Sequence, residues 1–217
     1  MTSMETKGTV IVTAANGGLG SAFVERLLQS KPSNQYGIFT VRGLTAQSSG
    51  TLEKLLSSSS YPHSIVPLDL TSLSAVREFT EDINTRVTTG EIPQIRAVVL
   101  NAAWQTFDGK IHYTKDGIET TFAVDYLSNF LLVLLLLKSI DPERGRIVFV
   151  SSFTHDTSHY MNSAFVSEKF IYRDPELIAH PDYQDKKGEE WVRGMRRYAL
   201  SKMLLIMFMY KSFVNLD

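Results

Sequence analysis

Short runs of hydrophobic residues alternate along the chain with longer segments in which hydrophobic residues recur at helical spacing. The short runs are rich in Val, Ile, Thr and aromatic residues, which predicts buried strands at 8–14, 36–41, 63–68, 95–100 and 146–150. The helical spacing predicts helices at 19–30, 52–56, 71–90, 117–140 and 189–213. Because strands that alternate with helices form βαβ units, we expect an α/β protein with a doubly wound parallel sheet.

No internal repeat and no Pro/Gly-rich linker divides the 217 residues. The length suits one domain with a sizeable core. We therefore expect a single dinucleotide-type domain over residues 1–217, in which a polar stretch separates the last strand from the last helix.

Charge and composition exclude several classes of protein. The chain carries 22 Lys and Arg against 23 Asp and Glu, for a net charge of −1, and has no cysteine. A nucleic-acid or anionic-membrane binder would need a basic excess, and a disulfide framework or thiolate zinc site would need cysteines. The start lacks an apolar signal segment, and the longest apolar run, 130–137, is far shorter than a membrane span. We expect a cytoplasmic protein.

The first strand runs into a glycine-rich segment, Thr13-Ala14-Ala15-Asn16-Gly17-Gly18-Leu19-Gly20, and a helix begins at once. Glycines let the backbone approach a pyrophosphate, and the helix N-terminus offers unpaired N–H groups and partial positive charge. The order strand, glycine turn, helix therefore predicts a dinucleotide site, although tight turns also use glycine for steric reasons.

The end of the second strand bears on which dinucleotide binds there. An acidic residue at that point would hold the ribose hydroxyls of NAD, whereas an arginine suits the 2′-phosphate of NADP. The sequence has Arg42, 22 residues after Gly20, and no acid nearby. We expect NADP as the cofactor, the alternative being a solvated surface arginine.

Two later motifs narrow the family. A Tyr-x-x-x-Lys motif, Tyr198 to Lys202, falls on the last predicted helix, and Ser151-Ser152 follows the fifth strand. With the glycine turn, this order resembles the short-chain dehydrogenase/reductase family, and in particular its long-insert members related to retinol dehydrogenases and reductases of filamentous fungi. The resemblance covers nearly the whole chain and implies a Rossmann sheet of five strands in the order 3-2-1-4-5, with a role in secondary metabolism.

The resemblance also implies roles for individual residues. Ser152 would be the catalytic serine, Tyr198 the proton donor, and Lys202 the activator of that tyrosine as well as a ribose ligand. The residues implied to bind the cofactor are Thr13, Ala15, Asn16, Gly17, Gly18, Leu19, Gly20, Arg42, Asp69, Leu70, Asn101, Ala102, Ala103, Tyr198 and Lys202. Helices 117–140 and 189–213 resemble those that pair subunits in this family, which implies a homodimer.

The Tyr–Lys pair has a physical rationale of its own. Residues four apart share one face of a helix. A free tyrosine titrates near pH ~10, so proton exchange near neutrality asks for a shift of about 4 kcal/mol. A lysine ammonium at ~4 Å supplies about that much at an effective dielectric of 20. A serine hydroxyl can hydrogen-bond the substrate oxygen as charge develops on it.

Three residues depart from the family pattern. Ala14 and Ala103 stand where glycines are usual; an alanine costs little if its φ is negative and more if its φ is positive. Asp125 stands where the family has an asparagine whose backbone helps to hold a water near the lysine. We count Asp125 among the catalytic candidates, because its charge could over-stabilise the Lys202 cation or trap it in a direct ion pair.

Further departures are the spacing and the end of the chain. Ser152 and Tyr198 are 46 residues apart, and we expect the aromatic-rich insert 153–197 to form the substrate-side wall. His155 and His159 in this insert lack a third ligand, so we expect no metal site. The sequence ends at Asp217, so the last strands of the family and the segment that covers the nicotinamide and substrate are expected to be missing. The insert's aromatic residues are Tyr160, Phe165, Phe170, Tyr172 and Trp191.

Three functions remain open at this point. The first is an NADP-dependent oxidoreductase that interconverts a carbonyl and an alcohol on an apolar small molecule. The second is a truncated relative with weak or lost catalysis that acts as a binding or interaction module. The third is a non-redox reaction, such as isomerisation, with Tyr198 as the acid or base.

Overall fold

The computed structural model describes residues 8–29, 35–108, 110–164, 174–181 and 189–211. Contacts between residues divide them into two compact units. The first unit takes its residues from 1–69, 74–102 and 132–150, and the second from 70–73, 103–131 and 151–217.

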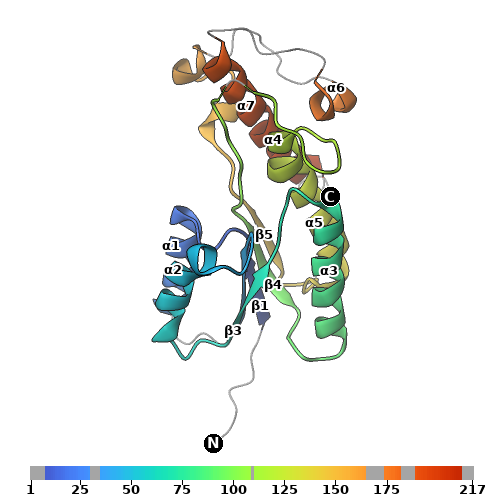
Figure 1. Cartoon of the computed structure of the whole chain (residues 1–217). Helices are drawn as coiled ribbons and strands as arrows, with labels where there is room; N and C mark the ends of the chain where they lie inside the picture. The colour runs from blue at the N-terminus through green and yellow to red at the C-terminus, as the bar shows by residue number, and fades with distance from the viewer. Residues whose placement is uncertain (1–7, 30–34, 109, 165–173, 182–188, 212–217) are drawn as a thin grey trace, which may run out of the picture. The chain divides into compact units, whose positions relative to one another are not determined.

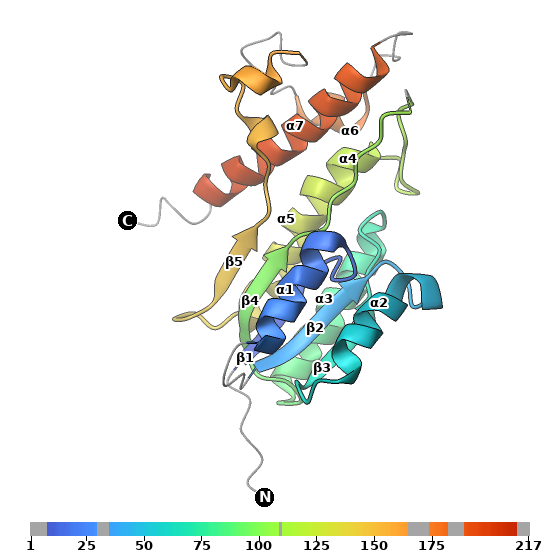
Figure 2. The ribbon, with the colours of Figure 1, turned by 90° about the vertical axis from the view of Figure 1, so that its left-hand side faces the viewer.

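The first unit is built on five parallel strands in the order β3-β2-β1-β4-β5. The predicted fold class and strand order are therefore confirmed. Helices α1 and α2 cover one face of this sheet, and α3 covers the other (Figure 1, Figure 2). The elements of this unit are β1 (Gly8–Val12), α1 (Gly18–Gln29), β2 (Gln35–Val41), α2 (Ala46–Ser57), β3 (His63–Pro67), α3 (Leu73–Thr88), β4 (Ile95–Leu100) and β5 (Arg146–Phe149).

The sequence of β1 explains why this strand lies in the centre of the unit. All five residues of β1 are buried, and strands buried on both faces read as continuous runs of β-branched residues rather than alternating ones. Val10 and Val12 pack with Phe39 of β2 and Leu52 of α2 in one apolar cluster. This cluster fixes β1 and, with it, the turn that follows the strand.

The second unit is mainly helical, and the central helix, whose residues from 132 onward belong to the first unit, is not uniform. We predicted one helix over 117–140; the structure has α4 (Thr120–Phe122), a π-helix η1 (Ala123–Leu127), α5 (Ser128–Leu136) and a 3₁₀ turn η2 (Leu137–Ser139). Asn129 Nδ2 donates to the carbonyl oxygens of Val124 and Asp125, 3.1 and 3.0 Å away. Hydrophobic periodicity does not distinguish a π-turn from an α-turn, and π-bulges often occur at functional sites.

Aromatic side chains join the central helix to α7 (Glu190–Met209), the last described helix. The rings of Phe122, Tyr126 and Phe130 follow one another at 5.6 and 5.9 Å between centroids, and Phe130 meets Phe208 at 4.7 Å. Such aromatic pairs stabilise a helix interface beyond the area they bury. They hold α7, which carries Tyr198 and Lys202, against the π-helix that carries Asp125.

Before α7 begins, the described part of the insert contains only short helices. They are η3 (Phe153–His155), η4 (Tyr160–Asn162) and α6 (Pro175–Ala179). Three predicted wall residues, Phe165, Phe170 and Tyr172, lie outside the described residues. The predicted role of the insert stays a prediction.

The segment Thr120–Ser139 is long and apolar enough to span a membrane by length and composition alone. However, 61% of its most apolar 18-residue window is buried within the protein. Core helices of globular proteins have the same property, so this segment gives only weak support for a membrane span.

Candidate active site

The turn between β1 and α1 is tied to the end of β4 by side-chain hydrogen bonds. Thr13 Oγ1 accepts the backbone N–H groups of Asn101 and Ala102, each at 2.9 Å. In return, Asn101 Nδ2 donates to the carbonyl oxygens of Thr13 and Ala14 at 3.0 and 3.2 Å. The structure thus brings the predicted pyrophosphate turn and the predicted ribose-binding asparagine together within the first unit.

Ala14 has a backbone φ of 48°, in the left-handed region. The sequence left open whether φ at this alanine is negative or positive, and it is positive. In this conformation the Cβ of an L-residue lies too close to its own backbone, which costs about 1–2 kcal/mol. The methyl group is retained at a position whose geometry favours glycine.

The glycines of the turn serve two different purposes. A Cβ added to Gly18 would meet no atom within 4 Å, so the space over the first residue of α1 is open. A Cβ added to Gly20 would collide with the carbonyl oxygen of Ala14 and the side chain of Asn101. The open N-terminus fits a pyrophosphate group, and Gly20 lets the helix pack closely against the turn.

The structure places the remaining predicted cofactor residues as follows. In the first unit, Ala15 is fully buried, Asn16 and Asp69 are half-buried, Arg42 is exposed directly after β2, and Gly17 and Leu19 are exposed in the turn. In the second unit, Leu70 is buried and Ala103 is exposed. Their roles in binding NADP stay predictions.

The predicted catalytic residues converge in the second unit. Ser152 hydrogen-bonds to the phenol of Tyr198, and its Oγ also accepts the N–H of Thr154 at 3.3 Å. Ser151 Oγ donates to the carbonyl oxygen of Lys202 at 3.1 Å. Lys202 Nζ lies 5.2 Å from the ring centre of Tyr198, so the two side chains share one face of α7 as the four-residue spacing predicts.

Asp125 makes a direct ion pair with Lys202. Its Oδ2 lies 3.4 Å from Lys202 Nζ, and the two side chains are 0% and 2% exposed. Asp125 Oδ1 accepts the backbone N–H of Trp104 at 2.6 Å, and Ser201 Oγ lies 3.2 Å from Oδ2. Burial raises the pKa of Asp125 to about 6, against the opposing effect of Lys202, so the carboxyl group is mostly ionised at neutral pH.

This pair changes the expected behaviour of Tyr198. We expected the lysine to lower the pKa of the phenol; instead the pKa of Tyr198 is raised, first by burial and then by the Asp125 carboxylate. Only the hydrogen bond with Ser152 acts in the other direction. The ammonium charge that should favour the phenolate is offset, because an anion lies against it in the protein interior.

Sequence reasoning missed two groups that hold this carboxylate. The backbone N–H of Trp104 is far from Asp125 in sequence, and no pattern points to it. Ser201 adjoins Lys202 within the Tyr-x-x-x-Lys motif, and its hydroxyl also lies 2.7 Å from the carbonyl oxygen of Tyr198. The small polar residue directly before Lys202 was the only feature of the sequence that could have indicated a hydrogen-bond donor to Asp125.

Comparison with known families decides the identity of the fold. The family model described as "short chain dehydrogenase" matches residues 8–174, which is more than half of the chain. The chain belongs to the short-chain dehydrogenase family. The matched residues include the glycine turn and Ser152, whereas Tyr198 and Lys202 lie beyond them.

Two curated relatives and one solved structure illustrate the similarity. The short-chain dehydrogenase iccH of Talaromyces variabilis is 47% identical over 160 residues, which cover 70% of this chain and 43% of that protein. Protochlorophyllide reductase B of Oryza sativa subsp. japonica is 32% identical over 156 residues, covering 70% and 37%. An NADPH-bound carbonyl reductase from chicken fatty liver superposes with a TM-score of 0.67 at 19% identity, covering 94% and 72%.

This short-chain dehydrogenase therefore spans less than half the length of those two curated relatives. The structural match is below 25% identity and supports the fold alone. That carbonyl reductase is bound to NADPH, so NADP(H)-binding proteins occur among the structural relatives.

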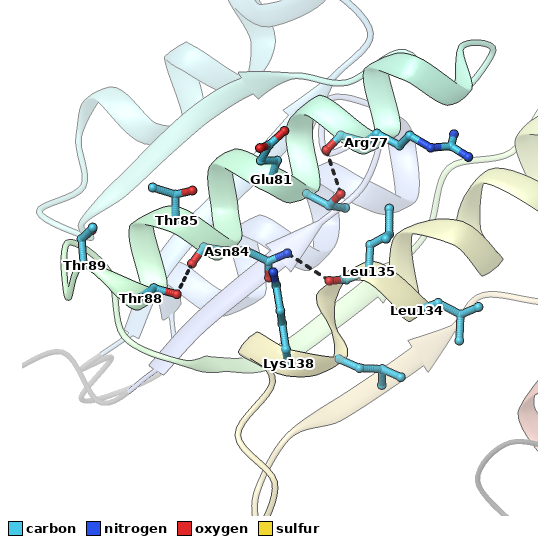
Figure 3. A pocket seen from close by; sticks show the side chains of 11 residues that line it. Arg77, Glu81, Asn84, Thr85, Thr88, Thr89, Leu134, Leu135 and Lys138 are labelled. Carbon is cyan, nitrogen blue, oxygen red and sulfur yellow. Dashed lines mark hydrogen bonds between the residues drawn. The ribbon is translucent and has the colours of Figure 1, made fainter.

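A separate groove of about 760 Å³ lies in the first unit of the short-chain dehydrogenase (Figure 3). Asn84 Nδ2 donates across it to the carbonyl oxygen of Leu135 at 3.0 Å, and Thr88 Oγ1 donates to the carbonyl oxygen of Asn84 at 2.8 Å. The groove contains none of the predicted site residues, and these polar groups already have partners within the protein. We assign no ligand to it.

Proposed function

We propose that this protein is an NADP-dependent oxidoreductase that interconverts a carbonyl and an alcohol on an apolar small molecule. The observation that carries the proposal is the convergence of Ser152, Tyr198 and Lys202 in one unit of a family member. The glycine turn at the start of α1 and Arg42 at the end of β2 support NADP as the cofactor. The cofactor supplies or accepts the hydride at the reacting carbon.

The protein's own residues handle the proton and the developing charge. In the reductive direction, Tyr198 transfers the proton of its hydroxyl group to the carbonyl oxygen, which becomes the alcohol oxygen. The Ser152 hydroxyl donates a hydrogen bond to the same oxygen while negative charge develops on it. The Lys202 ammonium stabilises the phenolate left on Tyr198, and the Asp125 carboxylate paired with Lys202 weakens this stabilisation.

A variant of the proton donor tests this function. We expect purified protein to consume NADPH with a panel of apolar ketones and aldehydes, and Tyr198→Phe to remove that activity while the fold and cofactor affinity persist. Tyr113→Phe, which alters an exposed tyrosine, is the matched control and should leave the rate unchanged. Equal turnover by Tyr198→Phe and the parent protein would refute the assignment.

A second function, an NADP-binding module with little or no turnover, is favoured by the raised pKa of Tyr198 and by the direct ion pair of Lys202 with Asp125. Calorimetry with NADPH, combined with single-turnover measurements, separates the two functions. Tight binding without hydride transfer to any carbonyl substrate supports the module, and measurable transfer supports the oxidoreductase.

The same proposal includes a cytoplasmic homodimer that binds neither nucleic acid nor membrane and acts in secondary metabolism. The net charge of −1 supports the first two exclusions. An apolar groove of about 670 Å³, lined by Phe130, Met207 and Phe208 among others, supports pairing through helices 117–140 and 189–213. Light scattering of the purified protein tests the dimer, and a monomer at micromolar concentration would exclude it.

A further inference from the structure

A second buried ion pair lies in the second unit, outside the set of catalytic candidates. Glu119 directly precedes α4, and Arg197 directly precedes Tyr198 on α7. Arg197 Nε and Glu119 Oε1 are 3.7 Å apart, and the two side chains are only 6% and 4% exposed. Burying two charges costs solvation free energy, so a buried ion pair adds little net stability to the folded protein. Such a pair can instead fix one arrangement of the segments that it joins.

Both partners make further bonds to different segments. Glu119 Oε2 accepts the N–H of Phe122 at 2.7 Å, and the Glu119 N–H donates to the carbonyl oxygen of Ala179 in α6 at 2.8 Å. Arg197 Nη2 donates to the carbonyl oxygen of Lys110 at 3.3 Å. The ion pair therefore joins the first turn of α4, the insert helix α6, the loop that contains Lys110, and α7.

A close backbone approach restrains the same face of α7 one turn earlier. A Cβ added to Gly194 would lie 2.5 Å from the carbonyl oxygen of Thr106 and 3.2 Å from the ring of Phe107. Gly194 and Arg197 are three residues apart, so they lie on one face of the helix. Two neighbouring restraints on one face oppose rotation of α7 about its axis.

Rotation of α7 matters because Tyr198 follows Arg197 directly. The Cα atoms of a helix lie about 2.3 Å from its axis, and the phenol oxygen extends several ångströms further, so a turn of about 10° moves that oxygen by roughly 1.5 Å. A misplacement of about 1 Å can cost roughly a hundredfold in rate.

We propose that Glu119 and Arg197 are positioning residues, whose buried ion pair sets the rotation of α7 and thereby places the Tyr198 hydroxyl against Ser152. Neither residue is among those proposed to act on the substrate. The effect of this ion pair on kcat rests on the proposed oxidoreductase function. Its effect on the position of the Tyr198 hydroxyl does not depend on that function.

Paired variants separate positioning from general stability. Glu119→Gln and Arg197→Met each leave a buried charge without its partner, so each should lower the Tm and kcat. The double variant buries no charge, and the amide oxygen introduced by Glu119→Gln can still accept the N–H of Phe122, so its Tm should recover. Positioning predicts that kcat of the double variant stays at least about tenfold below the parent value with KM for NADPH within about twofold. Recovery of kcat together with the Tm would overturn the proposal.

A matched control lies on the same helix. Arg193 Nε and Glu189 Oε2 form an ion pair at 3.0 Å, with the glutamate side chain 48% exposed. The double variant Glu189→Gln/Arg193→Met removes the same number of charges from the protein and should leave kcat within about twofold, since exposed pairs contribute little.

A titration that needs no turnover distinguishes failure of this proposal from failure of the proposed function. The phenolate absorbance of Tyr198 is obtained by subtracting the spectrum of Tyr198→Phe made in the same background. If positioning holds, the midpoint in the Glu119→Gln/Arg197→Met background should move by more than about half a pH unit, because the hydrogen bond of Tyr198 with Ser152 and its distance from the Asp125 charge change. An unchanged midpoint would refute positioning even if the parent protein has no oxidoreductase activity.

Discussion

Replacing Asp125 by asparagine should make Tyr198 more acidic. The substitution keeps the size of the side chain and an oxygen that can accept the N–H of Trp104, but it removes the negative charge beside Lys202. The Asp125 carboxylate raises the pKa of Tyr198, and its removal also leaves the Lys202 charge available to the phenolate. Both effects act in the same direction.

The distances set the size of this effect. Lys202 Nζ lies 5.2 Å from the ring centre of Tyr198 and 3.4 Å from Asp125 Oδ2, so that carboxylate oxygen is at most the sum of the two, 8.6 Å, from the ring centre. At that separation a unit charge contributes about 2 kcal/mol at an effective dielectric of 20 and about 0.5 kcal/mol in bulk water. These energies correspond to roughly 0.4–1.4 pKa units, so we expect the midpoint to fall by about one pH unit.

The assay is the pH dependence of the Tyr198 phenolate absorbance, measured against Tyr198→Phe, together with the pH profile of kcat if turnover is found. Circular dichroism must show that the variant folds, because Lys202 loses its buried counter-ion. Glu143→Gln removes one exposed carboxylate elsewhere and serves as the control for net charge. A midpoint for Asp125→Asn that is unchanged or higher would refute the reasoning.

Three further predictions concern stability and cofactor choice. Ala14→Gly should raise the free energy of unfolding by about 1 kcal/mol in urea titrations, since glycine adopts a φ of 48° without crowding, whereas the same change at the buried Ala15 should lower it. The pKa of Asp125 is raised from 3.8 to about 6 on folding, so the folded protein binds more protons between these values. Its free energy of unfolding should therefore fall by roughly 3 kcal/mol as the pH rises from about 4 through about 6, and Asp125→Asn should lack this fall. Arg42→Ala should reduce the preference for NADPH over NADH, in kcat/KM or in Kd, by about tenfold or more, because a charged hydrogen bond to the 2′-phosphate contributes about 1.5–3 kcal/mol; an unchanged preference would exclude the arginine as the discriminating residue.

Much of the fold follows from local patterns in the sequence. The runs at 63–68, 95–100 and 146–150 correspond to β3, β4 and β5 within one residue at each end, because consecutive β-branched residues favour strands. The edge strands β3 and β5 are, however, only partly buried, since each has a neighbouring strand on one side alone. The glycine turn and the Tyr-x-x-x-Lys spacing are also local, so the placement of the turn between β1 and α1 and of Tyr198 beside Lys202 follows from neighbours in sequence.

The central helix shows where local patterns fail. The apolar residues of 117–140 predict a single helix, but the chain inserts a π-turn at Ala123–Leu127, where Asn129 donates to two backbone carbonyls. Likewise, the pattern Thr-Ala-Ala-Asn-Gly-Gly does not show which residue takes the left-handed conformation. A hydrogen bond from Asn101, which directly follows β4, accompanies that conformation at Ala14.

The sequence alone determined the sheet, the position of the cofactor turn and the identity of the candidate catalytic residues. Only the tertiary structure decided how those residues are charged and held. Asp125 and Lys202 are 77 positions apart, and Glu119 and Arg197 are 78 apart. Whether two such charges meet, and how completely water is excluded from them, depends on the packing of α4, η1 and α7 rather than on any local pattern.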